Sequence, residues 1–442
     1  MANTYLTRTP SSTGNRQIFT YSAWVKRSQL SAYNTLFYAG ANSSTGGTIA
    51  FRFTNNDNLN VYIQDIGQFI TTNRLFRDTS AWYHIVLAID TTQATPDDRR
   101  KLYINGVQET SFSTSTEVNR NLNLSVNTSG QLQRIGTYAD SGGSLEGYFN
   151  GLMSYVAFVD GTAELPTIFG ETDSVTGQWK IKTDITPSVA WGTNGFLILK
   201  NGNSLTDEST NSNNFTLGGG TLTNTEDSPS NVFATMNALQ YSPNTTFSNG
   251  NNVVTQSVGG NGARRFTSTL GASSGKYYWE TKITGTVNGM TFGIVDGVEG
   301  DYNNYVGYKS KEVGYEKDGV IYKNAVAVTT GLTVVALNDV VNHALDLDNG
   351  YIYFGVNGTW QNSGVPTSGA TGTGGFSITA DTLYHPAVSA FANTGQISCN
   401  FGNGYFGTTA VTSAGTAGST PGIFEYDVPS GYQPLSTKGL NA

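Results

Sequence analysis

Apolar and polar residues alternate along most of this chain with a period of two, which predicts β-strands with one buried face. Two segments show the pattern most clearly, residues 19–25 and 341–347. Their apolar faces carry Phe19, Tyr21, Ala23 and Val25 in the first segment and Val341, His343, Leu345 and Leu347 in the second. No window keeps a helical period, and the one helical turn expected, within 163–169, is limited by Pro166. The pattern predicts an all-β chain.

Turn signals separate the predicted strands. Asn-Gly occurs ten times, and this dipeptide suits two-residue hairpin turns because both residues accept a positive φ. Asn105-Gly106 follows the apolar run Leu102-Tyr103-Ile104, and Asn357-Gly358 follows residues 353–356. Both are expected to close β-hairpins.

The density of these strands divides the chain into three regions. Residues 1–165 and 238–442 carry strand after strand, whereas residues 166–237 are rich in Gly, Asn, Ser and Thr. The middle region still contains the strand-like run 196–199, so it is expected to be structured. We predict two antiparallel jelly-roll or β-sandwich domains in tandem, joined by a structured connector.

Charge and cysteine content narrow the classes of function. The 442 residues carry a net charge of -8 with only 13% charged residues, and no basic stripe is present, which argues against nucleic-acid binding. Apolar runs are too short to cross a membrane. The N-terminus lacks the apolar segment of a signal peptide, so we expect synthesis in a cytoplasm. The single cysteine, Cys399, is expected to be a small core residue.

No residue pattern predicts catalysis, so we expect a protein that is not an enzyme. Glycosidases place acidic residues on both sides of the sugar bond. The nearest pattern, Asp346-Leu347-Asp348, precedes an Asn-Gly turn, where carboxylates commonly hold turn amides. The three histidines lie on separate predicted strands without metal-ligand spacing: His84, His343 and His385.

Loop aromatics beside Asn, Asp and Gly are the better functional signal, because sugars are bound by aromatic faces and small polar groups. The candidate ligand-binding residues are Tyr302, Asn303, Asn304, Tyr305, Trp360, Tyr138 and Asp140. Asp140 and Asp301 are also loop carboxylates of the kind that bind calcium. Neither lies in a ligand-rich loop of fixed spacing, so no cofactor or metal is predicted, and calcium stays an open alternative.

Residues 1–165 resemble a laminin-G/concanavalin-A-like domain. The resemblance lies in an aromatic-rich strand, a Trp-x-His strand, a Tyr-Ile-Asn-Gly hairpin and a Phe-x-Gly strand, which follow one another in the order 19–27, 82–87, 102–106 and 149–153. Residues 238–442 resemble a SPRY domain. The segments that carry this resemblance are 274–280, 339–348, 353–358, 385–389 and 397–402.

The connector and the C-terminus, at residues 227–237 and 429–432, resemble segments of tail-fibre-like proteins of bacteriophages. This resemblance implies a virion surface protein that adheres to a host-cell glycan or protein, contacts other virion proteins and forms a homo-oligomer, commonly a trimer. Without a predicted shaft, a capsid decoration or head-fibre protein is the main alternative. A glycan-degrading tailspike is the third, although no short β-helix repeat is present.

Overall fold

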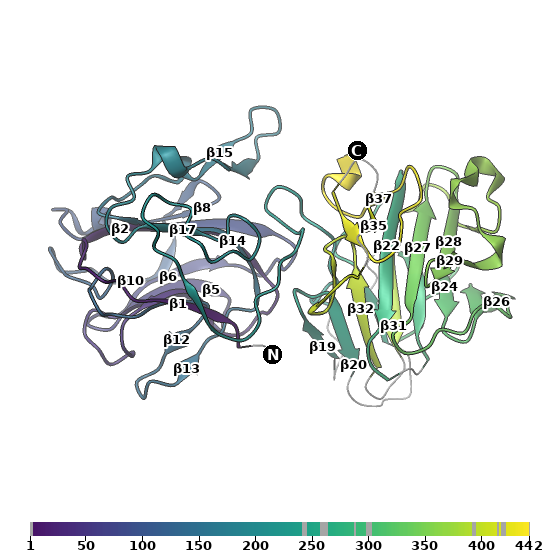
Figure 1. The fold of residues 1–442 in the computed structure, drawn as a ribbon, viewed down its shortest axis with the longest axis horizontal. Coiled ribbons are helices and arrows are strands. Elements are labelled where there is room, and N and C mark those ends of the chain that lie inside the picture. Colours follow the sequence, from purple (N-terminus) through teal and green to yellow (C-terminus); the bar gives the residue numbers. More distant parts are fainter. Residues whose placement is uncertain are drawn as a thin grey trace. The chain divides into compact units, whose positions relative to one another are not determined.

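The chain folds as two compact units, which divide between Asn224 and Thr225. The computed structural model describes residues 3–240, 245–256, 264–286, 289–297, 303–390, 395–412, 415–416 and 421–441. Both units consist of layered antiparallel sheets with short 3-10 helices (Figure 1). The prediction of two all-β sandwiches in tandem is confirmed.

The first unit contains two large sheets. The eight-stranded sheet has the order β10 (Phe112–Ser115), β6 (Gly67–Leu75), β5 (Asn58–Ile63), β4 (Ile49–Phe53), β3 (Asn34–Ala39), β11 (Gln133–Ile135), β1 (Tyr5–Arg8), β18 (Thr216–Gly219). The six-stranded sheet has the order β17 (Phe196–Ile198), β14 (Gly151–Asp160), β2 (Ile18–Arg27), β7 (Trp82–Asp90), β8 (Arg100–Ile104), β9 (Val107–Glu109). Smaller elements are the ribbons β12 (Tyr138–Ala139) with β13 (Leu145–Glu146) and β15 (Gly170–Thr172) with β16 (Trp179–Ile181), and the 3-10 helices η1 (Pro96–Arg99), η2 (Pro166–Ile168) and η3 (Thr186–Ser188).

The core of this unit lies between the two sheets, as the alternation predicts. Phe19, Tyr21, Ala23 and Val25 all point into it from β2. The Tyr21 ring lies 5.4 Å from Phe37 and 5.8 Å from Phe51, both on the opposite sheet. Aromatic pairs at these separations stabilise the fold beyond the area they bury.

The outer face of the six-stranded sheet is buried as well. It is covered by residues that follow β14, including Phe169, Ile185 and Trp191. His84 of β7 fixes this cover, because its Nδ1 accepts a hydrogen bond of 2.9 Å from Trp179 Nε1 and its Nε2 lies 2.9 Å from Ser22 Oγ. The indole of Trp24 stacks on the same imidazole at 4.7 Å. Burial lowers the pKa of His84 to about 3, so the ring is neutral at pH 7.

Part of the predicted connector, residues 166–237, completes the first unit. β17 pairs with β14, and β18 pairs with β1 at the edge of the eight-stranded sheet. The contacts of residues up to 224 lie with this unit. Residues after 224 lie with the second unit, where Ala234 and Met236 enter the core.

The second unit is also a sandwich. Its nine-stranded sheet has the order β19 (Thr245–Ser248), β20 (Val253–Gln256), β32 (Gly395–Asn400), β22 (Lys276–Ile283), β27 (Val340–Asp346), β28 (Tyr351–Val356), β29 (Thr359–Trp360), with β30 (Phe376–Ser377) on β28 and β37 (Gln433–Pro434) parallel to β22. The six-stranded sheet has the order β21 (Arg264–Thr267), β31 (Tyr384–Ala390), β23 (Thr291–Asp296), β24 (Val313–Glu316), β25 (Val320–Lys323), β26 (Val326–Thr329). Smaller elements are β33 (Tyr405–Phe406), β34 (Thr409–Ala410), β35 (Gly415–Thr416), β36 (Ile423–Phe424), η4 (Gln361–Ser363), η5 (Pro366–Thr371) and η6 (Gly439–Asn441).

The predicted core positions of the second unit are confirmed. Val341 and Leu345 belong to the core, and the buried His343 stacks on Trp279 with ring centroids 4.7 Å apart. Cys399 is fully buried in the same cluster, as expected of a small core residue.

The predicted Asn-Gly hairpins also form. Asn105 and Gly106, between β8 and β9, have φ of 48° and 80°, and Asn357 and Gly358, between β28 and β29, have φ of 49° and 80°. Both residues of each pair therefore adopt the left-handed conformation that this turn requires.

A buried glutamate holds the C-terminal segment over the outer face of the nine-stranded sheet. Glu280 of β22 accepts hydrogen bonds from the backbone N–H groups of Glu425 and Tyr426, at 2.8 and 2.9 Å. It also accepts them from the Tyr278 hydroxyl and from Asn400 Nδ2. The covered face carries Tyr278, Ala344 and Tyr353, and Phe424 and Tyr432 of the C-terminal segment pack on it. Burial raises the pKa of Glu280 to about 7 despite these donors.

The raised pKa of Glu280 gives a testable pH dependence. A folded-state pKa above that of the unfolded chain means that its contribution to stability is fully present below about pH 4 and is lost as pH rises to about 7, a change on the order of 3 kcal/mol. Urea unfolding of the whole chain at several pH values should show this loss, and Glu280→Gln should remove it. Parallel pH profiles for the two proteins would contradict the assignment.

Candidate functional site

Four side chains from separate segments meet on the outer face of the eight-stranded sheet in the first unit. Along β4, Ile49, Phe51 and Phe53 enter the core, so the intervening Arg52 points to the other face. Around Arg52 lie Tyr33, which precedes β3, Tyr62 of β5 and Tyr138 of β12. We call these four residues, with Glu146 of β13, the Arg52 cluster.

The rings of the cluster surround the Arg52 guanidinium. Its Cζ lies 4.6 Å from the centroid of Tyr33, 4.7 Å from that of Tyr138 and 5.7 Å from that of Tyr62. These distances are within the range of cation–π attraction. The Tyr33 and Tyr138 rings lie edge to face at 6.4 Å. Tyr33 is 39% exposed, whereas Arg52, Tyr62 and Tyr138 are half-buried.

The ribbon β12–β13 places Tyr138 over Arg52. Its turn is held by Asp140, whose carboxylate accepts the backbone N–H groups of Gly142 and Ser144 at 2.9 and 2.7 Å. The base of the ribbon is held to β3, where Thr35 N–H donates to Gly147 O at 2.9 Å. The Tyr138 hydroxyl donates to Glu146 Oε2 at 2.9 Å, and burial, followed by this hydrogen bond, raises its pKa to about 12.

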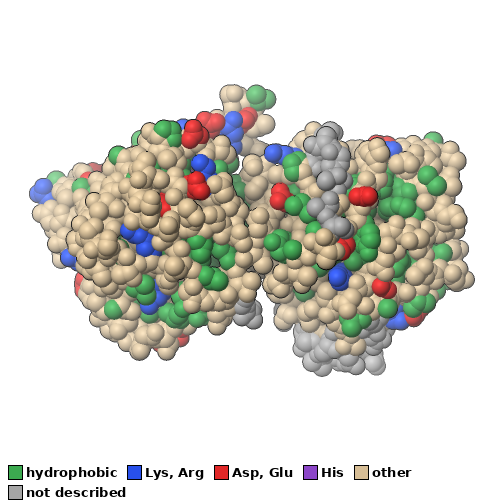
Figure 2. Space-filling view, in the orientation of Figure 1, with side chains coloured by type: hydrophobic (Ala, Val, Ile, Leu, Met, Phe, Trp, Pro, Cys, Tyr) green, Lys and Arg blue, Asp and Glu red, His purple; other side chains and the backbone are tan. Residues whose placement is uncertain are grey.

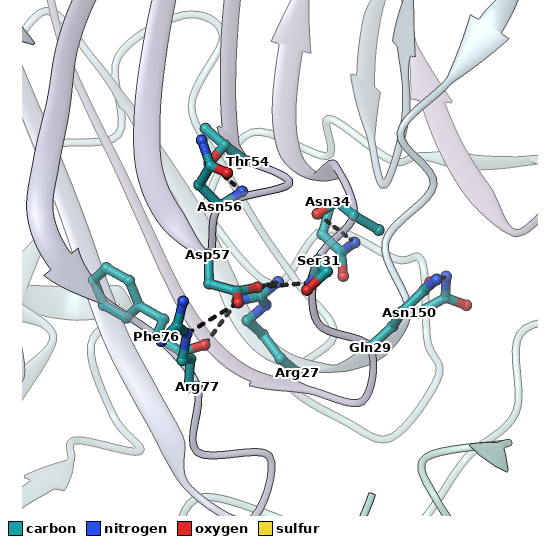
Figure 3. A network of polar contacts seen from close by, with 11 residues as sticks. Arg27, Gln29, Ser31, Asn34, Thr54, Asn56, Asp57, Phe76, Arg77 and Asn150 are labelled. Atoms are coloured by element: carbon teal, nitrogen blue, oxygen red, sulfur yellow. Dashed lines mark hydrogen bonds and ion pairs between the residues drawn. The ribbon is translucent and has the colours of Figure 1, made fainter. Parts of the chain in front are cut away.

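A second network fixes the loop that carries Tyr33. Asp57 Oδ1 accepts a hydrogen bond from Ser31 N–H at 2.8 Å and one from Arg27 Nη2 at 3.0 Å. Figure 3 shows Asp57 between Arg27 and Arg77, with the Arg27 side chain reaching across from β2. Arg27 also donates to Phe76 O at 2.7 Å and is fully buried. The loop between β2 and β3 is therefore tied to the sheet by a buried ion pair.

Two of the sequence-predicted residues, Tyr138 and Asp140, thus belong to this region, Tyr138 as a member of the cluster and Asp140 as the holder of the turn. Sequence analysis did not find Arg52 or Tyr62, because both lie within strands. The alternation of β4 indicates that Arg52 faces away from the core, but no local signal shows which rings lie beside it.

The other predicted candidates lie in the second unit. Tyr302 and Asp301 are outside the described residues. Asn303 is exposed and Asn304 is half-buried. Tyr305 packs against Tyr308 at 5.5 Å and Tyr322 at 5.2 Å, and burial raises its pKa. This tyrosine group is a second candidate surface.

Trp360 is half-buried at the end of β29. Its ring meets Tyr278 edge to face at 6.5 Å and packs on the apolar outer face of the nine-stranded sheet. In this position its contacts with the protein are extensive, and a ligand contact through its exposed part stays a prediction.

The two acidic residues considered for catalysis, Asp346 and Asp348, form an ion pair and hydrogen bonds with neighbouring residues of the protein. The buried Asp346 pairs with Lys276 Nζ at 2.9 Å and accepts the Asn349 backbone N–H at 3.0 Å, while Asp348 accepts Gly275 N–H at 2.7 Å. Among the described residues, no three His, Cys, Asp or Glu side chains come together where a metal ion could bind.

Charged side chains are sparse on each unit. On the visible face, Figure 2 shows Lys and Arg scattered among Asp and Glu, within a surface that is mostly uncharged. In the described part of the chain, no helix has the length and apolar character needed to cross a bilayer.

Comparison with known proteins identifies both domains. Residues 2–168 match the family described as concanavalin A-like lectin/glucanases superfamily, and residues 276–403 match the SPRY domain. The chain therefore carries an N-terminal concanavalin A-like domain and a C-terminal SPRY domain, two kinds that are typically non-catalytic binding domains. No curated protein matches the chain.

Three solved structures illustrate the similarity. The SPRY domain of human HERC1 is 18% identical, with a TM-score of 0.29, and the match covers 37% of this chain and 96% of that one. The TRIM65 PSpry domain is 14% identical, with a TM-score of 0.30 and coverage of 38% and 91%. A heptameric SAP-like pentraxin from Limulus polyphemus is 15% identical, with a TM-score of 0.28 and coverage of 36% and 71%.

The ion pair behind Tyr33 gives a prediction about stability. Asp57→Asn leaves the buried Arg27 without its charge partner and should lower the free energy of unfolding of the first unit by about 3 kcal/mol. Arg77→Gln is the matched control, because Arg77 contacts the same carboxylate at 3.3 Å but is 60% exposed. Arg77→Gln should lower the free energy of unfolding by less than about 1 kcal/mol.

Urea unfolding of the whole chain, with hydrogen exchange assigning each transition to a unit, measures both variants. Equal effects of the two substitutions would contradict the role given to Arg27–Asp57.

Proposed function

We propose that this chain is a non-catalytic adhesion protein of a bacteriophage virion surface, which binds a glycan of the host-cell envelope. The Arg52 cluster is the observation that supports it most directly. It presents an exposed aromatic ring beside hydrogen-bonding groups on a rigid sheet, and both domains are of kinds that typically bind rather than catalyse.

The chemistry of the cluster suits a sugar. The face of the Tyr33 ring can stack on the apolar face of a pyranose, and Glu146 and Tyr138 offer hydrogen-bonding groups for hydroxyls. A shallow site of this size binds weakly on its own. Several copies on one particle would raise the overall affinity through multivalency.

The binding proposal is tested with the whole chain, clustered on streptavidin, against a glycan array and a panel of bacterial cells. Tyr33→Ala removes the exposed ring and should lower binding about fivefold, since stacking on an aromatic face is worth on the order of 1 kcal/mol. Tyr308→Ala tests the second candidate surface instead, because Tyr308 is a similarly exposed tyrosine (43%) of the tyrosine group in the second unit. It should leave binding unchanged.

The reverse result, loss with Tyr308→Ala alone, would move the site to the tyrosine group of the second unit. Failure of the unaltered, clustered chain to bind any glycan or cell would overturn the adhesion proposal.

Capsid decoration is the second candidate function. The helices of the described residues are all short 3-10 turns, so this part of the chain contributes no helical shaft, and two compact sandwiches suit a protein that packs on a capsid. Antibody-gold labelling of purified particles separates the two functions. Label at the tail supports adhesion, label spread over the head supports decoration, and unlabelled particles contradict both.

A further inference from the structure

The half-buried Arg52 is not paired as the buried arginines of the first unit are. Arg27 has Asp57, and Arg99 donates three hydrogen bonds to the carbonyls of Gln93, Ala94 and Val118. Arg52, in contrast, forms neither a hydrogen bond nor an ion pair with any described residue. Its buried Nε has no acceptor, which is also true of Arg27, so the difference between the two lies in the terminal Nη groups, which are hydrogen-bonded in Arg27 and not in Arg52.

The terminal Nη groups of Arg52 are the donors that a ligand can reach, because Nε alone is shut off from solvent. The three tyrosine rings compensate the positive charge in part, but a ring face satisfies none of the N–H donors in the guanidinium plane. A planar group with five donors is suited to a carboxylate, which it binds through two parallel hydrogen bonds.

We infer that the Arg52 cluster binds an acidic sugar, whose carboxylate pairs with the Arg52 guanidinium while the sugar ring stacks on Tyr33. This inference rests on the proposed glycan-binding function and specifies the charge of the ligand. The ligand class is a hexuronate or another sugar acid. A sulfated sugar shares the anionic chemistry but is tetrahedral, and it matches the planar donor fork less well.

Glu146 is the acidic residue of the cluster, and its position is compatible with an anionic ligand. Its Oε2 is engaged by the Tyr138 hydroxyl, and its side chain is exposed, so water screens its charge. We expect it to accept hydrogen bonds from ligand hydroxyls and to orient Tyr138.

The test measures binding of the whole chain to matched pairs of oligosaccharides that differ in one group: galacturonate and galactose, glucuronate and glucose, mannuronate and mannose. In at least one pair the acidic member should bind at least about tenfold more tightly, because a charge-assisted pair is worth more than about 1.4 kcal/mol. Arg52→Gln should abolish the preference. Arg52→Lys, which keeps the charge but loses the planar fork, should retain only part of it.

Stability separates a binding role from a structural one. Arg52→Met keeps an apolar stem and removes the unpaired donors, so the melting temperature of the first unit should stay the same or rise. In the binding measurements, Arg77→Gln controls for a general loss of positive charge, because Arg77 is an exposed arginine of the same unit.

Each outcome is decisive. Equal binding of acidic and neutral members, unchanged by Arg52→Gln, overturns the inference and leaves the adhesion proposal standing. Tighter binding of a galactose 6-sulfate oligosaccharide than of every uronate overturns the carboxylate assignment. Destabilisation by Arg52→Met would make Arg52 structural and would also overturn the inference, whereas absence of binding to any glycan or cell overturns the adhesion proposal itself.

Discussion

Burial of the central strands on both faces is the constraint on which the rest of this structure depends. In the first unit, β2 and β7 have the sandwich core on one side and the segment after β14 on the other. In the second unit, β22 and β27 have the core on one side and the C-terminal segment on the other. A sheet that is buried twice must satisfy the polar groups of its outer face, and each unit does so with one side chain that also holds the cover.

The side chains that attach the two covering segments, His84 in the first unit and Glu280 in the second, do so by different chemistry. His84 stays neutral and accepts a hydrogen bond from the Trp179 indole, so the cover of the first unit is attached side chain to side chain. Glu280 accepts two backbone N–H groups of the covering segment, so the cover of the second unit is attached through its main chain. Because the six-stranded sheet of the first unit is covered in this way, the outer face of its eight-stranded sheet is the one left to carry the Arg52 cluster beneath only a short ribbon.

The features of this fold that depend on neighbouring residues could be predicted from the sequence. The Asn-Gly turns and the alternation of β2 and β27 depend on neighbouring residues, and their predictions were confirmed. The continuous burial of β2 could not be predicted, because the cover that buries Ser22 and Trp24 comes from residues more than a hundred positions later. The candidate site was predicted only in part for the same reason. Tyr138 was predicted because it is an aromatic residue in a loop. Arg52 was not, because its proposed role depends on tyrosine rings from three other segments.

The attachment of β17 and β18 to the first unit also bears on how such domains are exchanged between genes. A fragment that ends at residue 165 would lack one edge strand of each large sheet, and it would expose Val86, Tyr103 and Ala157 to water. The portable module is therefore the whole first unit up to Asn224, and viable recombination joints are expected near that residue. A joint at the end of the first strand-rich region would produce a domain with a bare apolar face.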